Sequence, residues 1–225
     1  MSAEIVTDHS QYPTALRGRL LLVFIASAAS YVLLDAVDIQ GPWMPAAKAL
    51  PIAVLGLLAL GELRGLTRSL TLTALGFSAL GDVLLALDFP NHFVFGLGAF
   101  LVAQLVYAAN FLRGANFHSR RFALRALPIL VVTPLLAWLL LPAAGELATP
   151  VLVYLSAIVL MSLGAAAHRG KSGLLFAGAL TFMVSDTLIA VNRFLLPLPL
   201  AGVAVMLSYY SAQCMLLYGI VRARA

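Results

Sequence analysis

Residues 20–37, LLLVFIASAASYVLLDAV, carry a single charged side chain, Asp35, and residues 122–141, FALRALPILVVTPLLAWLLL, are almost as apolar. Across all 225 residues, 62% are hydrophobic and 10% are charged. A soluble domain has roughly 45–50% apolar and 25% charged residues. Too little polar sequence remains to cover such segments in water, so they must face lipid or one another.

Apolar segments of this length recur along the whole chain. As helices of roughly 20 residues, they are long enough to cross about 30 Å of hydrocarbon. Glycine and proline separate consecutive segments. The expected spans are residues 20–38, 44–61, 68–87, 92–112, 122–141, 147–166, 172–190 and 199–221. The sequence therefore predicts an all-α, polytopic membrane bundle of about eight transmembrane helices. We expect a single transmembrane domain over residues 1–225, with a short cytoplasmic N-terminal segment, 1–19.

The basic residues test this segmentation, because they collect in the cytoplasmic loops of membrane proteins. Twelve of the fourteen fall in the N-terminal segment, in or beside the loops after the second, fourth and sixth spans, or in the C-terminal tail. They are Arg17, Arg19, Arg64, Arg68, Arg113, Arg120, Arg121, Arg125, Arg169, Lys171, Arg222 and Arg224. Arg193 falls in an opposite loop and Lys48 inside the second span. Both termini are therefore expected in the cytoplasm, and an alanine- and arginine-rich chain favours a bacterial inner membrane.

Other classes of protein fit less well. The net charge of +5 is dispersed over short loops and does not gather on one face, which argues against nucleic acid as a partner. Cys214 is the only cysteine, so no intrachain disulfide forms. No small-residue cleavage site follows a short apolar core near the N-terminus, which favours an uncleaved first helix over a signal peptide.

Parts of the chain resemble each other. Asp82-Val-Leu-Leu-Ala-Leu-Asp88 in the third span matches Asp186-Thr-Leu-Ile-Ala-Val-Asn192 in the seventh, and Ala103-Gln104 matches Ala212-Gln213. Helices four apart run in the same direction. The matches favour two parallel four-helix repeats, an arrangement found in some transporters. They are short, so a bundle without internal symmetry stays open.

Two carboxyls inside the spans are the leading site candidates, because an ionisable group in hydrocarbon costs at least about 2.5–3.5 kcal/mol. Asp82 and Asp186 lie a few residues inside their span ends and within the matched segments. We expect them to form a functional pair in the outer half of the membrane, close to Lys48. For the other polar groups, lysine snorkelling and an interfacial aromatic belt are equally good explanations.

Six motifs follow one another in the second to eighth spans. They are Lys48-Ala-Leu-Pro51, Phe77-Ser-Ala-Leu-Gly-Asp82, Gly96-Leu-Gly-Ala-Phe-Leu-Val-Ala-Gln104-Leu-Val-Tyr107, Pro150-Val-Leu-Val-Tyr154, Phe182-Met-Val-Ser185-Asp186 and Tyr209-Tyr210-Ser-Ala-Gln213. Together they resemble the lysoplasmalogenase, or YhhN-like, family of bacterial and animal membrane proteins. The departure is Gln104, where the family pattern usually has histidine. Glutamine cannot exchange protons as histidine does, so the activity of this member is left open.

The resemblance implies a membrane hydrolase that cleaves the vinyl ether bond of lysoplasmalogen-like lysolipids to a fatty aldehyde and a glycerophospho-base. Such hydrolysis needs an acid to protonate the alkene carbon, stabilisation of an oxocarbenium ion, and a base to direct water. Asp82 and Asp186 are the catalytic candidates, in either assignment. The substrate-binding candidates are Lys48, Gln104, Tyr154, Ser185, Asn192, Arg193, Tyr209 and Gln213, with Lys48 and Arg193 suited to the phosphate.

No metal or other cofactor is implied, because the carboxylates and a distant His92 show no ligand spacing. The alternative is a small proton-coupled transporter or a lipid-binding membrane protein, since parallel repeats and buried charges also suit a carrier. The expected partners are a lysolipid substrate and membrane lipids. The exact lipid and the oligomeric state stay open.

Overall fold

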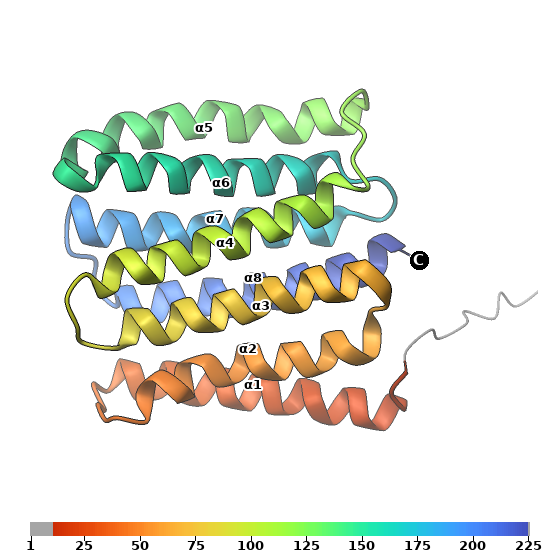
Figure 1. Ribbon diagram of the computed structural model, residues 1–225, viewed down its shortest axis with the longest axis horizontal. Coiled ribbons are helices and arrows are strands. Elements are labelled where there is room, and N and C mark those ends of the chain that lie inside the picture. Colours follow the sequence, from red (N-terminus) through yellow and green to blue (C-terminus); the bar gives the residue numbers. More distant parts are fainter. Residues whose placement is uncertain (1–10, 225) are drawn as a thin grey trace, which may run out of the picture.

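Apolar runs separated by short loops fold into a bundle of long helices in the computed structural model, which describes residues 11–224 (Figure 1). The helices are α1 (Thr14–Ala36), α2 (Met44–Glu62), α3 (Gly65–Ala86), α4 (His92–Leu112), α5 (Arg120–Ala144), α6 (Ala148–Ala167), α7 (Gly173–Phe194) and α8 (Ala201–Arg224). The described part of the chain contains no β-strand. The all-α prediction is confirmed.

Seven continuous helical stretches are long and apolar enough to span a membrane, whereas we expected about eight. The difference lies in Arg120–Ala167, where α5, the 3-10 helix Gly145–Leu147 (η1) and α6 follow without a break over 48 residues. The expected fifth span ended at residue 141, just before Pro142, but α5 continues through that proline. The chain turns back at Gly145, whose φ of +55° suits glycine. Figure 1 shows α5 and α6 as antiparallel neighbours, and the chain is an integral membrane protein.

Two helix ends differ most from the expected spans. Helix α1 begins at Thr14 and not at residue 20, because Arg17 joins the helix and pairs with Glu62 of α2 (Nε to Oε1, 2.7 Å). Residues 1–10 of the expected N-terminal segment lie outside the described residues. Helix α7 continues to Phe194, so Arg193 lies in its last turn and not in a loop as predicted.

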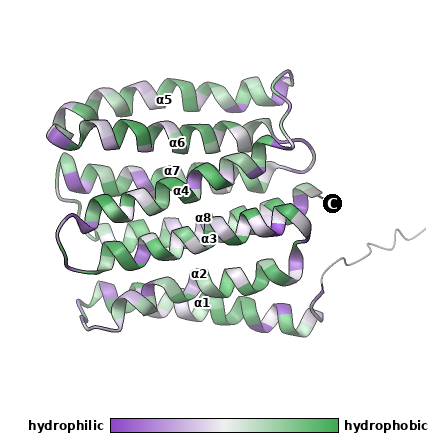
Figure 2. Cartoon of the chain, in the orientation of Figure 1, coloured by the Kyte–Doolittle hydropathy of each residue, from purple (hydrophilic) through white to green (hydrophobic). Residues whose placement is uncertain are grey.

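The first described helix starts and the last one ends at the same end of the bundle (Figure 1). Consecutive helices alternate in direction, so helices four apart run the same way. Hydrophobic residues dominate the length of the helices, and hydrophilic ones are concentrated near the two ends (Figure 2). This arrangement agrees with an even number of crossings and with parallel halves, although the repeat itself stays a prediction.

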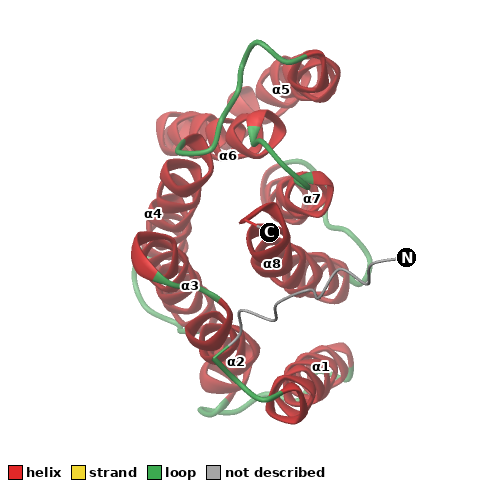
Figure 3. Ribbon diagram, turned by 90° about the vertical axis from the view of Figure 1, so that its right-hand side faces the viewer, coloured by secondary structure: helices red, strands yellow, loops and turns green. Residues whose placement is uncertain are grey.

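Helices α7 and α8 approach closely because glycines line their contact. A Cβ on Gly219 would lie 2.5 Å from the Leu175 backbone, and one on Gly178 would lie 2.9 Å from the Leu216 nitrogen. Small residues let membrane helices pack at short range. Seen along the bundle, α8 lies inside the arc formed by α2, α3, α4 and α6 (Figure 3). The polar side chains of α8 are therefore held in the interior.

Candidate functional site

Asp186 of α7 is held by side chains from two other helices. The Tyr154 hydroxyl of α6 donates a hydrogen bond to its Oδ2 at 2.7 Å, and Gln104 Nε2 of α4 donates to the same oxygen at 2.8 Å. Gln104 is fully buried. No hydrogen bond within the described chain engages Asp186 Oδ1. The structure thus brings together three of the predicted site residues and leaves one carboxyl oxygen available.

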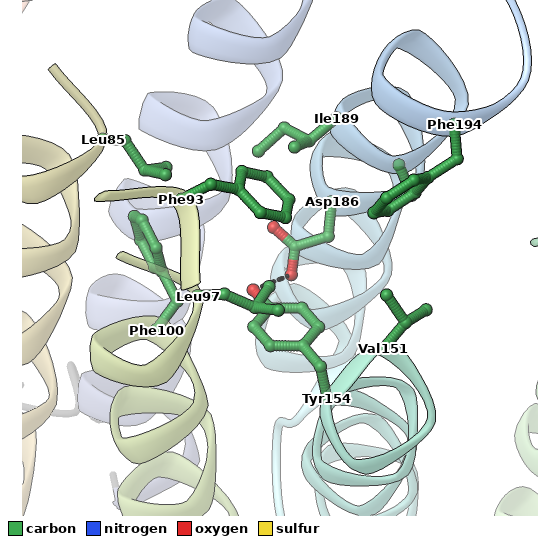
Figure 4. A pocket seen from close by; sticks show the side chains of 10 residues that line it. Leu85, Phe93, Leu97, Phe100, Val151, Tyr154, Asp186, Ile189 and Phe194 are labelled. Carbon is green, nitrogen blue, oxygen red and sulfur yellow. Dashed lines mark hydrogen bonds between the residues drawn. The ribbon is translucent and has the colours of Figure 1, made fainter. Parts of the chain in front are cut away.

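Asp186 and Tyr154 line a cavity of about 50 Å³ between α3, α4, α6 and α7 (Figure 4). The other lining side chains are apolar: Leu85, Phe93, Leu97, Phe100, Val151, Ile189, Ala190 and Phe194. A water molecule needs roughly 10–15 Å³ of such space. The cavity therefore takes a few waters or a short part of a lipid chain, beside one carboxyl.

A cation lies next to the aromatic rim of this cavity. The Arg193 guanidinium is 5.1 Å from the centroid of the Phe93 ring, and Phe93 packs edge-to-face on Phe194 at 6.0 Å. Arg193 is exposed, so its donors are accessible. Asn192 Oδ1 instead accepts a hydrogen bond from the Leu198 nitrogen at 2.9 Å. Of these two candidates, Arg193 presents exposed cationic donors beside the cavity, whereas Asn192 is engaged by the backbone.

Asp82 of α3 has a different environment. It is 2% exposed, it accepts a hydrogen bond from the Tyr209 hydroxyl of α8 at 2.8 Å, and Lys48 is near enough to interact with its charge. The Lys48 carbonyl accepts a hydrogen bond from Tyr210 at 2.7 Å. Asp82 is not among the residues that line the Asp186 cavity. The expected carboxyl pair therefore does not share that cavity.

An aromatic cluster separates the two carboxyl sites. The Tyr209 ring lies 5.6 Å from that of Phe100 and 5.8 Å from that of Phe182. Phe100 in turn lines the Asp186 cavity. Tyr209 therefore contacts Asp82 through its hydroxyl and the cavity wall through its ring.

Two further candidates connect helices within the bundle. Gln213 of α8 donates from Nε2 to Ser78 Oγ at 2.9 Å and accepts from the Tyr107 hydroxyl at 2.8 Å. Ser185 donates to the Val205 carbonyl at 3.1 Å. These bonds join α8 to α3, α4 and α7. Neither Gln213 nor Ser185 lines the Asp186 cavity.

The candidate list omitted the apolar wall of the cavity. Phe93, Leu97, Phe100 and Gln104 lie on one face of α4 at spacings of four, three and four residues. That periodicity, with Gln104 as its last member, is present in the sequence. Apolar residues at this spacing occur on every helix of the chain, so the pattern alone did not distinguish a cavity from ordinary packing.

Comparison with known proteins gives a consistent result. The YhhN family model matches residues 43–220 of this chain. The lysoplasmalogenase TMEM86B of Sus scrofa is 35% identical over 202 residues, covering 88% of this chain and 85% of the relative. A lysoplasmalogenase of Mycobacterium tuberculosis is 34% identical over 181 residues, covering 78% and 69%. No solved structure matches the chain.

Proposed function

This chain belongs to the YhhN family, and on that premise we propose that it is a lysoplasmalogenase. It hydrolyses the vinyl ether bond of a lysoplasmalogen or a similar lysolipid, releasing a fatty aldehyde and a glycerophospho-base. The observation that carries the proposal is the Asp186 carboxyl, which lies in an apolar cavity between membrane helices.

The hydrogen bonds of Asp186 orient it as a general acid. Tyr154 and Gln104 both donate to Oδ2, which occupies that oxygen as an acceptor. A proton on the neutral acid then resides on Oδ1 and is available as a donor. In Figure 4 the oxygen that is not bonded to Tyr154 points to the Phe93 side of the cavity. The acid proton is therefore directed at whatever occupies the cavity.

Hydrolysis then follows in balanced steps. Asp186 transfers its proton to the outer vinyl carbon, and the oxocarbenium ion that forms lies beside the new carboxylate. Water adds to the carbon bonded to the ether oxygen and returns a proton to Asp186. The hemiacetal breaks its bond to the glycerol oxygen, which takes up the hydroxyl proton, and leaves the aldehyde.

The spacing of Asp186 and Arg193 fits a lysoplasmalogen. Seven residues of α7 separate them, which is about 10 Å along a helix. The reacting vinyl carbon of a lysoplasmalogen is about seven covalent bonds from phosphorus, or roughly 8 Å at the reach per bond of an extended chain. Arg193 can therefore bind the phosphate while the vinyl ether reaches Asp186, with Lys48 as a second cation on the same half of the bundle.

Asp82 contributes differently in this proposal. It is a positioning residue, because it bonds the hydroxyl of Tyr209, whose ring packs on Phe100 in the cavity wall. A fixed Phe100 ring keeps the vinyl ether against Asp186, and small displacements of a reacting group are costly to rate.

We also propose that the protein lies in a bacterial inner membrane with both termini in the cytoplasm. In support, α1 begins and α8 ends at the same end of the bundle, and most loop arginines lie there. A reporter fused after Ala225 should report the cytoplasm, and one in the loop at Glu146 should report the outer side.

The decisive experiment is hydrolysis by the purified protein in D₂O. Lysoplasmalogen should yield aldehyde with one deuterium on the carbon next to the carbonyl, because the acid protonates that carbon. The saturated ether analogue has no alkene to protonate and should be inert. Absence of aldehyde release from the vinyl ether lipid overturns the proposal and favours a carrier, which pH-dependent uptake into liposomes would detect.

A further inference from the structure

A second cavity, of about 210 Å³, lies at the opposite end of the bundle from Asp186. Unlike the first, its lining includes polar and charged side chains: Thr67 of α3, Asn110 of α4, and Arg113 and His168 from the loops that follow α4 and α6. None of the residues that line it is a carboxylate. A water molecule needs roughly 10–15 Å³ of such space, so there is room for a polyatomic ligand.

The loops around this cavity are fixed by backbone pairing. The Asn116 nitrogen donates to the Ala167 carbonyl at 2.7 Å, and the Arg169 nitrogen donates to the Gly114 carbonyl at 2.9 Å. A Cβ on Gly114 would lie 2.6 Å from His168 Nε2, so the imidazole sits directly against this glycine. The wall is thus held in place before any ligand arrives, which lowers the entropic cost of binding.

The polar groups of the cavity retain unused donors. Within the described chain, Arg113 donates a single long hydrogen bond, from Nη1 to Thr67 Oγ1 at 3.4 Å. A guanidinium carries five N–H groups in a fork that matches phosphate oxygens. Asn110 donates one of its two amide hydrogens to Thr71 Oγ1 at 3.2 Å. Asn110 and Thr67 are each 6% exposed, so they form the buried side of the cavity and Arg113 its exposed side.

Charge at this end of the bundle favours an anion. The basic residues of the α2–α3, α4–α5 and α6–α7 loops and of the α8 end gather here. The described carboxylate of this end, Glu62, is paired with Arg17. Such an excess of one sign around a recess raises the local concentration of the opposite ion.

From this geometry we propose that the cavity binds a phosphate group, either free or as the phosphomonoester headgroup of an anionic lipid. Arg113 supplies two parallel N–H donors to two phosphate oxygens, and Asn110 and Thr67 bind a third oxygen on the buried side. A carboxylate has two oxygens and one charge and would leave these buried donors unused. The site is separate from the Asp186 cavity and does not depend on its chemistry.

Free phosphate is tested by titration calorimetry of the purified protein in detergent, with chloride keeping the ionic strength constant. The Arg113→Gln variant should bind inorganic phosphate on the order of tenfold more weakly or worse. The matched control is Arg120→Gln, which removes a charge from the same end but not from the cavity. Measurable phosphate binding that is equally tight in wild type and Arg113→Gln, or that is weakened equally in Arg120→Gln, overturns the proposal.

The lipid source is tested in nanodiscs of phosphatidylcholine with and without phosphatidic acid. Native mass spectrometry should find phosphatidic acid retained by the wild type, released by added phosphate, and lost from Arg113→Gln. Retention without calorimetric binding assigns the site to the headgroup, and the reverse assigns it to the free anion. If neither lipid retention nor calorimetric binding is observed, the proposal is overturned. If Arg113→Gln does not fold, Arg113→Lys keeps the charge without the fork and should still weaken both signals, and unchanged signals contradict the assignment.

Discussion

Asp82 and Asp186 stand in matching stretches of sequence on helices that run in the same direction, yet their surroundings differ. Asp186 borders an apolar cavity and accepts two hydrogen bonds on one oxygen. Asp82 is 2% exposed, bonds Tyr209 and has Lys48 nearby. The position of each carboxyl along its own helix sets its depth in the membrane. The side chains of the neighbouring helices set its hydrogen bonds and its charge environment.

The difference originates in helices α2 and α6. The first two turns of α2 supply the cation Lys48 to Asp82, and the first two turns of α6 supply the neutral hydroxyl of Tyr154 to Asp186. A carboxyl with neutral donors and an open cavity is placed for proton transfer. One that accepts a hydrogen bond from a tyrosine and has a lysine charge nearby is better suited to joining helices. Similar sequence stretches thus have different surroundings, which supports the proposed division into a reaction site and a positioning residue.

The largest effect in this comparison of the two carboxyls is expected from Asp186→Asn. Asn keeps the shape of the side chain and removes the acid, so kcat for aldehyde release should fall by about 10²–10⁴-fold. The measurement is aldehyde release by purified protein, with the thermal unfolding midpoint as the control for folding. Asp186→Glu retains the acid and should keep part of the activity. Near-normal release by Asp186→Asn would contradict the assignment of this residue as the acid.

A smaller loss is expected at the other carboxyl. Asp82→Asn should lower kcat by about 10- to 10²-fold, because Tyr209 and Phe100 lose their fixed position, while KM changes little. Tyr209→Phe removes the same hydrogen bond and should give a similar loss. The double variant should be little worse than either single one, since the two groups act as a unit. Additive losses, or a change confined to the unfolding midpoint, would exclude the positioning role.

The fold was largely predictable from the sequence, because lipid imposes one constraint on every segment. Apolar length and basic loops located the helices within a few residues. The predicted helix bounds were wrong where a local contact or turn determined the backbone conformation. The pairing of Arg17 with Glu62 extends α1, and the 3-10 helix Gly145–Leu147 joins α5 and α6 into the stretch Arg120–Ala167.

The site residues stay a prediction, and the sequence did not indicate how the structure groups them. The cost of a carboxyl in lipid selected Asp82 and Asp186. The positions of the two aspartates within their spans place both in the same half of the membrane. These positions contain no information on which helices become neighbours. The aromatic cluster around Tyr209 that separates the two carboxyls is a property of helix packing. No spacing in the sequence indicates it.

A weaker effect is expected where the Asp186 site meets the headgroup region. Arg193→Gln removes the guanidinium beside Phe93 and should raise KM by several-fold to about tenfold, with kcat nearly unchanged. The reason is that a phosphate contact binds the substrate and its transition state equally. Arg222→Gln, at the other end of the bundle, is the matched control. A fall in kcat without a change in KM would show that Arg193 acts in the chemical step.

The smallest effect is expected from Gln104→His, which restores the usual residue of the family pattern. Gln104 is fully buried, donates to Asp186 Oδ2, and has an Oε1 atom without a hydrogen-bond partner among the described residues. Histidine offers one donor to Asp186 on a ring of similar size, so the acid should stay oriented. Activity should therefore change by less than about threefold or increase, as expected for the loss or gain of one neutral hydrogen bond.

The matched variant Gln104→Leu keeps the volume and removes the donor. It should lower kcat more than Gln104→His does, because Tyr154 alone then orients Asp186. The same substitution at Gln213 removes the bonds to Ser78 and Tyr107. It should lower the unfolding midpoint and leave kcat nearly unchanged. A larger fall in kcat for Gln213→Leu than for Gln104→Leu would reverse the comparison, since it would place the reaction next to Asp82.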